Sequence, residues 1–151
     1  MTRPADNLDA IEPFLGELIQ QLEPRSRRKA IDKLMRLLRR ANAQRITRNV
    51  EPDGNAMTKR KPRKGRRGKM FRQIGKARNL RIRVTPDEGE LHFVNPLIEH
   101  TAAVHHYGET GFVGKTRDGK IIRTKFDARR LLGFGPEQDE LLDELLKQFS
   151  E

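Results

Sequence analysis

Three histidines, His100, His105 and His106, are the residues of this chain whose type most readily suggests metal chemistry. Their spacings of five, six and one residues include no i, i+4 pair, the arrangement that places two imidazoles on one face of a helix. Hydrogen bonding at a helix end or an interface is the usual alternative for such side chains. The chain contains no cysteine, which excludes thiolate ligands and disulfides. The sequence therefore predicts no metal site and no cofactor.

Nucleotide binding and nucleophilic catalysis have equally little support. The stretch Gly114-Lys115-Thr116 resembles the end of a P-loop, but that motif needs a glycine five residues before Gly114, where Glu109 stands. The two serines, Ser26 and Ser150, lack the flanking glycines of a nucleophile elbow. We predict no catalytic residues and no enzyme.

Positive charge is the strongest chemical signal in the sequence. The net charge is +11, and the stretch from Lys59 to Arg83 contains thirteen Lys and Arg residues and no acid. Basic side chains that neutralise phosphates release counterions, which gives affinity for nucleic acid without sequence preference. Aromatic residues do not alternate with these charges, which argues against stacking of single-stranded bases. The alternative is a solubilising loop whose charges repel one another.

From Met57 to Lys69, glycine and basic residues alternate and there is almost nothing to bury. Such a segment cannot recover its ordering entropy alone. We therefore expect a mobile basic arm, residues 53–69, that becomes ordered against an anion or another subunit. The candidate residues for contact with DNA or a neighbouring subunit are Lys59, Arg60, Lys61, Arg63, Lys64, Arg66, Arg67, Lys69 and Arg72.

Composition limits the rest of the architecture. A length of 151 residues with 34% apolar and 35% charged residues allows one domain, 1–151, with a modest core. The N-terminus lacks the apolar region of a signal peptide, and no apolar run approaches the length of a membrane span. We expect a soluble protein of the cytosol with no membrane contact.

An N-terminal helical hairpin is predicted before the arm. Apolar residues at helical spacing between Leu8 and Leu22 indicate its first helix, and Pro24 interrupts the pattern before a second helix from Ser26 to about Arg48. The expected buried stripe of the second helix is Ile31, Leu34, Met35, Leu38, Ala41 and Ile46. Its expected solvated face is Arg27, Arg28, Lys29, Arg36, Arg39, Arg40 and Arg45.

The second half of the chain alternates between short elements. Strict alternation over 80–84, followed by 91–94 after a turn, predicts a small antiparallel sheet. A central short helix is expected over 97–107 with Gly108 as its left-handed cap and with Leu97, Ile98, Ala102 and Val104 on its apolar side.

Three further features complete the predicted α+β order ααββαβα. Ile121, Ile122 and Phe126 are candidates for one edge strand, and the segment 131–134 is a short apolar corner. A C-terminal helix should start near Pro136 and bury a stripe composed of Leu141, Leu142, Leu145, Leu146 and Phe149.

Four stretches follow one another along nearly the whole chain in an order that carries a resemblance. They are Arg45-Ile46 through Pro52-Asp53-Gly54, then Met70-Phe71, then Ala103-Val104-His105-His106-Tyr107-Gly108, then Ala128-Arg129 with Leu131-Leu132-Gly133-Phe134 before an acidic, leucine-rich helix. In these stretches the chain resembles the phage virion morphogenesis family, the tail-completion S proteins of temperate contractile-tailed phages. His106 stands where members usually have a polar residue such as Gln, and Arg130 where they usually have Pro.

The resemblance implies a structural role late in virion assembly. Such proteins complete the tail or neck so that a filled head joins a finished tail, and related neck proteins form rings, commonly of six. It implies a homo-oligomer, most simply a hexamer, that contacts tail tube, sheath or neck and connector proteins, with nonspecific contact with packaged DNA also open. It places the protein in the virion, at the neck or tail end, and in the host cytoplasm during assembly.

The resemblance also assigns roles to motif residues. His105, Tyr107 and Gly108 would fix the end of the central helix. Four residues would shape the corner, in the core or at a subunit joint: Arg129, Leu131, Leu132 and Gly133. The alternative function is that of a sequence-nonspecific nucleic-acid-binding protein acting through the basic segment 59–83.

Overall fold

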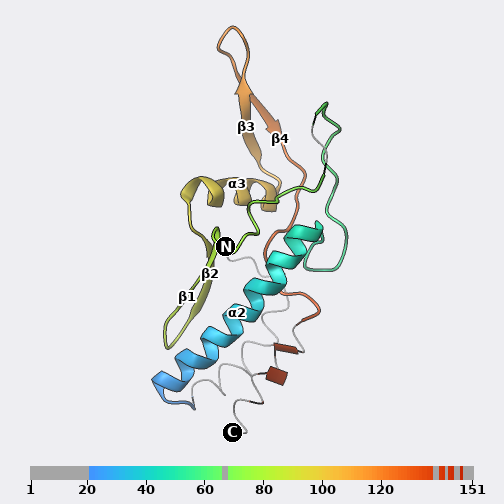
Figure 1. Cartoon of the computed structure of the whole chain (residues 1–151). Coiled ribbons are helices and arrows are strands. Elements are labelled where there is room, and N and C mark those ends of the chain that lie inside the picture. The colour runs from blue at the N-terminus through green and yellow to red at the C-terminus, as the bar shows by residue number, and fades with distance from the viewer. Residues whose placement is uncertain (1–20, 66–67, 138–139, 142, 145–146, 148–151) are drawn as a thin grey trace.

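A long helix forms one side of the molecule, one β-hairpin lies alongside it, and a short helix lies between this hairpin and a second one that projects beyond it (Figure 1). The computed structural model describes residues 21–65, 68–137, 140–141, 143–144 and 147. The first helix of the predicted N-terminal hairpin falls largely outside these residues. Within them the order is αββαββ, with two separate two-stranded antiparallel sheets. The predicted α+β class is confirmed.

The long helix, α2, spans Pro24–Arg48. It begins two residues before the predicted Ser26, because proline fits the first turn of a helix, where its missing N–H has no partner in any case. It ends at Asn49, which adopts the left-handed conformation with φ 55°. Its buried residues are Ala30, Ile31, Met35, Leu38, Asn42, Arg45 and Ile46. Arg45 was expected on the solvated face, and that expectation is wrong.

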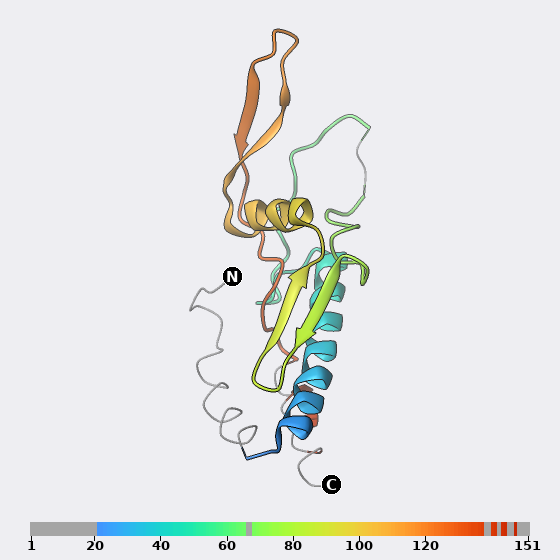
Figure 2. The ribbon, with the colours of Figure 1, turned by 90° about the vertical axis from the view of Figure 1, so that its left-hand side faces the viewer.

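The first hairpin packs on α2. Strand β1 (Leu80–Val84) pairs with β2 (Gly89–Phe93) in the register that sets Leu80 opposite Phe93. Both views show this sheet lying alongside the helix (Figures 1 and 2). A Cβ atom on Gly89 would lie 2.6 Å from Met35 Cγ, so glycine permits this close approach. The predicted hairpin is confirmed.

Helix α3 spans Pro96–Tyr107 and matches the predicted central helix. Its N-terminus is capped by Asn95, whose Oδ1 accepts a hydrogen bond of 2.8 Å from the Leu97 N–H. Gly108 ends it with φ 67°, as predicted. Ala102 and Val104 are buried, whereas Leu97 is 72% exposed and does not belong to the apolar side. Leu97 lies in the first turn of the helix.

The second hairpin corrects the prediction of a single edge strand. Strand β3 (Thr110–Lys115) pairs with β4 (Ile121–Lys125), and the register shifts between Phe112 and Gly114 at a bulge. The two strands extend away from the rest of the molecule, past α3 (Figures 1 and 2). Gly114 and Lys115 lie in β3, so they do not form a phosphate-binding loop before a helix.

The core lies between α2, the first hairpin and α3. One cluster of buried side chains consists of Ile46, Met57, Leu80, Phe93, Ala102 and Leu131, and a second consists of Ile31, Met35 and Leu38. Met70, Phe71 and Ile74 pack against the first cluster. Met57 is only 3% exposed, so the prediction that the arm buries almost nothing is wrong at this residue.

The C-terminal segment returns to α2. Residues 140, 141, 143, 144 and 147 are helical, while Pro136 and Glu137 form a turn before them. Leu141 is buried as predicted, and the predicted stripe residues Leu142, Leu145, Leu146 and Phe149 lie outside the described residues. No helix in the described part of the chain has an apolar stretch of the length that crosses a bilayer.

Candidate assembly site

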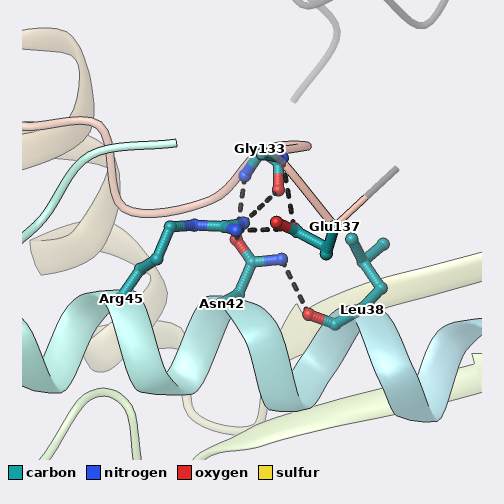
Figure 3. Close-up of polar contacts among 6 residues, drawn as sticks. Leu38, Asn42, Arg45, Gly133 and Glu137 are labelled. Carbon is teal, nitrogen blue, oxygen red and sulfur yellow. Dashed lines mark hydrogen bonds and ion pairs between the residues drawn. The ribbon is translucent and has the colours of Figure 1, made fainter. Parts of the chain in front are cut away.

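The apolar corner, residues 131–134, is held against α2 by a buried polar network (Figure 3). Arg45 donates from Nη2 to the Gly133 carbonyl at 2.7 Å and to Asn42 Oδ1 at 3.0 Å. Asn42 Oδ1 also accepts the Gly133 N–H at 2.9 Å, and Asn42 Nδ2 donates to the Leu38 carbonyl at 2.9 Å. Asn42 is 1% exposed. Two polar side chains of the helix therefore bind the backbone of the corner directly.

Glu137 completes this network from the far side of the corner. Its Oε1 accepts from Arg45 Nη1 at 2.5 Å and from the Gly135 N–H at 3.1 Å. Burial acts to raise the pKa of the Glu137 carboxyl. The hydrogen bond from Arg45, the backbone N–H groups of Glu137 and Gly135, and the charge of Arg45 together hold that pKa below its usual value. Glu137 is therefore an ion-pair partner of α2.

A sequence signal for this network exists in the spacing of α2. Ile31, Met35 and Leu38 are four and three residues apart, and the same spacing continues to Asn42 and Arg45. Residues with this spacing share one face of a helix. The two polar residues were missed because their type was given more weight than their position.

Two of the four stretches that carry the family resemblance, residues 103–108 and 128–134, meet at the end of α3. The Arg129 N–H donates to the His105 carbonyl at 2.8 Å, and the Leu131 N–H donates to His106 Nδ1 at 3.1 Å. A Cβ atom on Gly108 would lie 2.9 Å from the Ala128 backbone nitrogen, so glycine is required by space as well as by φ. The predicted roles of the helix end and the corner are thus parts of one joint. An amide oxygen at position 106 could accept the same hydrogen bond.

Arg129 ties this joint to the basic arm. Its side chain is buried, and Nε donates to the Thr58 carbonyl at 2.6 Å. The next residue, Arg130, donates its backbone N–H to Glu51 Oε1 at 3.0 Å, a contact that proline could not make. Leu131 is 1% exposed and belongs to the core, whereas Leu132 is only partly buried against it.

His105 is enclosed by aromatic rings. Its ring centroid lies 5.0 Å from that of Phe71 and 4.5 Å from that of Phe126. Burial, and secondly the charge of Arg129, lower the pKa of His105. The imidazole of His105 therefore packs the end of α3 against Phe71 and Phe126. The ring centroid of Tyr107 lies 4.8 Å from that of His106.

Asn49 clamps both ends of the exposed part of the basic arm. Its backbone carbonyl accepts the Met57 N–H at 2.8 Å. Its side chain accepts the Met70 N–H and donates to the Met70 carbonyl, both at 2.9 Å. Residues 58–69 therefore leave and rejoin the core at one point, which is the end of α2 (Figure 1).

Most predicted contact residues of the arm are open to solvent. Lys59, Lys61, Arg63, Lys64, Lys69 and Arg72 are exposed. Arg60 is half-buried and donates to the Gly68 carbonyl at 3.1 Å, and Arg66 and Arg67 lie outside the described residues. The described residues contain no cluster of three or more His, Asp or Glu side chains that could hold a metal ion.

The β3–β4 hairpin displays apolar side chains that nothing in the described part of the chain covers. Phe112 is 62% exposed, and Val113, Ile121 and Ile122 are also strongly exposed. Only the base of the hairpin is packed, where Gly111 approaches Phe126 and Val104. The other two strongly exposed large hydrophobic residues among those described, Val94 and Leu97, lie where β2 leads into α3.

Comparisons with known proteins identify the family. The model of the phage virion morphogenesis family matches residues 6–149. The chain is similar to the tail completion protein S of Escherichia phage P2, with 30% identity over 141 residues, which cover 89% of this chain and 91% of that protein. No solved structure matches the chain. The agreement extends over almost the whole length, so the chain belongs to the phage virion morphogenesis family, whose members are structural phage proteins and not enzymes.

Proposed function

We propose that this protein completes the phage tail at its head-facing end and thereby enables a filled head to join it. The observation that carries the proposal is the similarity to tail completion protein S of phage P2 over 89% of this chain and 91% of that protein. A span of this length covers most of both chains, so the two proteins share more than a short motif. The protein acts as a structural component of the neck or tail end in the virion and assembles in the host cytoplasm.

The assembled form that we propose is a ring, most simply of six copies. The β3–β4 hairpin supports association, because a two-stranded sheet with Phe112 and Ile121 in water is marginally stable on its own. The hairpin and the Val94–Leu97 surface lie on different elements, and contact between unlike surfaces of identical subunits closes a ring when the rotation permits. Tail tube, sheath and neck or connector proteins are the proposed neighbours of this ring.

Electron microscopy of an induced lysate tests the role. An early stop codon in this reading frame should leave full heads beside unattached tails with unfinished ends. Supplying the intact protein from a plasmid should restore virions. Normal numbers of intact virions from the stop mutant would refute the role.

The oligomer has its own test. Light scattering after size exclusion should give a mass several times that of the chain. The double variant Phe112→Ser, Ile121→Ser should give the mass of a monomer, with little change in the free energy of unfolding. A wild-type monomer at every concentration would refute self-association and leave the tail-completion role standing.

The alternative function is nonspecific nucleic-acid binding by a free monomer through segment 59–83. The exposed charges of the basic arm favour this function, and the segment 59–83 contains no acidic residue that would neutralise them. A monomer that binds duplex DNA tightly at physiological salt, and loses that binding when Lys59, Lys61 and Lys64 are changed to Gln, would favour this function over the ring.

A further inference from the structure

The side of α2 that faces away from the core carries an open, concave surface, which we call the arginine groove. Its lining residues are Arg36, Arg39, Arg40, Ala43, Gln44, Thr47, Arg48 and Ala77. Four of the eight are arginine, none is acidic, and none is a large apolar or aromatic residue. Protein interfaces usually place such an apolar anchor at their centre, so this composition favours a polyanion over an acidic protein partner.

The groove has two walls because the chain returns to α2 at Gly75. A Cβ atom on Gly75 would lie 3.2 Å from Ile46 Cγ2 and 3.4 Å from the Ala43 carbonyl, so glycine allows this segment to lie against the helix. Ala77 then faces the small residues of α2 across the groove. Lys76 and Arg78, its neighbours in sequence, do not line the groove, but both are exposed and add positive charge to the same segment of the chain.

The positive charge of the groove is largely unneutralised. Arg36 donates to Asp32 Oδ2 at 2.7 Å, but among the described residues no carboxylate forms an ion pair with Arg39, Arg40 or Arg48. Arg36 and Arg48 are twelve residues apart, which is about 18 Å along a helix, or about half a turn of B-DNA. This length accommodates several successive phosphates of one strand.

We propose that the arginine groove binds the sugar-phosphate backbone of duplex DNA without sequence preference. Arginine donates two parallel hydrogen bonds to a phosphate, and small side chains along the floor let the backbone approach. The groove reaches Arg48, the last residue of α2, next to the point where Asn49 holds the basic arm (Figure 1). The groove and the arm therefore form one positive surface, and the binding does not depend on the tail-completion role.

Fluorescence anisotropy of the full chain on labelled duplexes of about 30 base pairs tests the groove, with salt varied from about 50 to about 200 mM. The triple variant Arg39→Gln, Arg40→Gln, Arg48→Gln should bind about tenfold or more weakly, and its salt dependence should fall by up to about 2.7 in slope, about 0.9 for each lost phosphate contact. Two duplexes of unrelated sequence should give the same affinity.

The matched control is Arg25→Gln, Arg28→Gln, Lys29→Gln, which removes the same charge from exposed positions at the other end of α2. In this control the slope of log affinity against log salt concentration should fall by less than about 0.9. Equal losses in both triple variants would show a diffuse charge effect and overturn the proposal. The absence of DNA binding by the wild type, or full retention by the groove variant, would overturn it as well.

Discussion

The corner network and the β3–β4 hairpin invert the usual distribution of side chains. At the corner, Arg45 and Asn42 are buried, and their hydrogen bonds fix the backbone at Gly133. On the hairpin, Phe112 and Ile121 are exposed and have no cover in the described chain. The two terminal nitrogens of Arg45 and the amide of Asn42 have their partners within the subunit, and the exposed apolar groups do not. The first region therefore specifies the fold of one copy, and the second is available for assembly.

The two hairpins offer the largest test of this contrast, because each contains a phenylalanine. Phe93 is 6% exposed in the first hairpin, and its replacement by Ala should lower the free energy of unfolding by about 4 kcal/mol. Phe112→Ala in the second should lower it by less than about 0.5 kcal/mol. Urea denaturation at low protein concentration measures both. Similar losses at the two positions would mean that the second hairpin is packed within the subunit.

Removing the buried cation should have the next largest effect. Arg45→Ala leaves Glu137 without its ion pair and the Gly133 carbonyl without its donor, which should cost about 3 kcal/mol. Arg40→Ala, on the exposed side of the same helix, should change stability by less than about 0.5 kcal/mol. If both variants unfold at the same urea concentration, the network does not hold the corner.

Two glycines sharpen the comparison at smaller scale. Gly89→Ala places a methyl group 2.6 Å from Met35 Cγ and should cost about 2 kcal/mol through overpacking. A methyl group added to Gly114, in the second hairpin, would meet no atom within 4 Å, and Gly114→Ala should leave stability unchanged within about 0.5 kcal/mol. Thermal unfolding of the two variants measures both changes. A larger loss of stability in Gly114→Ala than in Gly89→Ala would contradict the conclusion that the second hairpin is not packed within the subunit.

The smallest expected effect is a change in pH dependence. Burial and then Arg129 lower the pKa of His105 below 6.5, so the unfolded chain binds more protons as the pH falls through that value. This contribution to stability is complete above 6.5 and is lost between 6.5 and the lower pKa of the folded protein. His105→Asn should reduce the fall in unfolding free energy between about pH 7.5 and about pH 5.5. An unchanged profile in His105→Asn would show that another group causes the dependence.

Local signals allowed much of the fold to be predicted. The left-handed glycine at 108 and the alternation over 80–84 each act within a few residues, and both elements were correct. A strand at Ile121 and Ile122 was predicted, but its partner β3 was missed, because Gly111 and Gly114 interrupt the apolar pattern of β3 and the bulge after Phe112 shifts its period. The bulge is not visible without the partner strand.

The candidate site was predictable in its parts but not in its connections. His105, Gly108 and Arg129 were identified by resemblance, yet the hydrogen bond from the Arg129 N–H to the His105 carbonyl joins segments that spacing does not relate. Likewise Arg45 and Glu137 are 92 residues apart, and composition placed Arg45 on the solvated face. Long-range polar pairs depend on tertiary packing, which a periodic pattern does not encode.

The clamp at Asn49 makes the positively charged segment an exchangeable module. Since Met57 and Met70 are tied to one residue, the span between them can change in length at a cost of only about 0.6 kcal/mol for each doubling. Its composition can also change without disturbing the buried side chains below it. Variation in this segment can therefore adjust charge, reach or partner while the body of the subunit stays the same, and an inserted tag at its tip should be tolerated for the same reason.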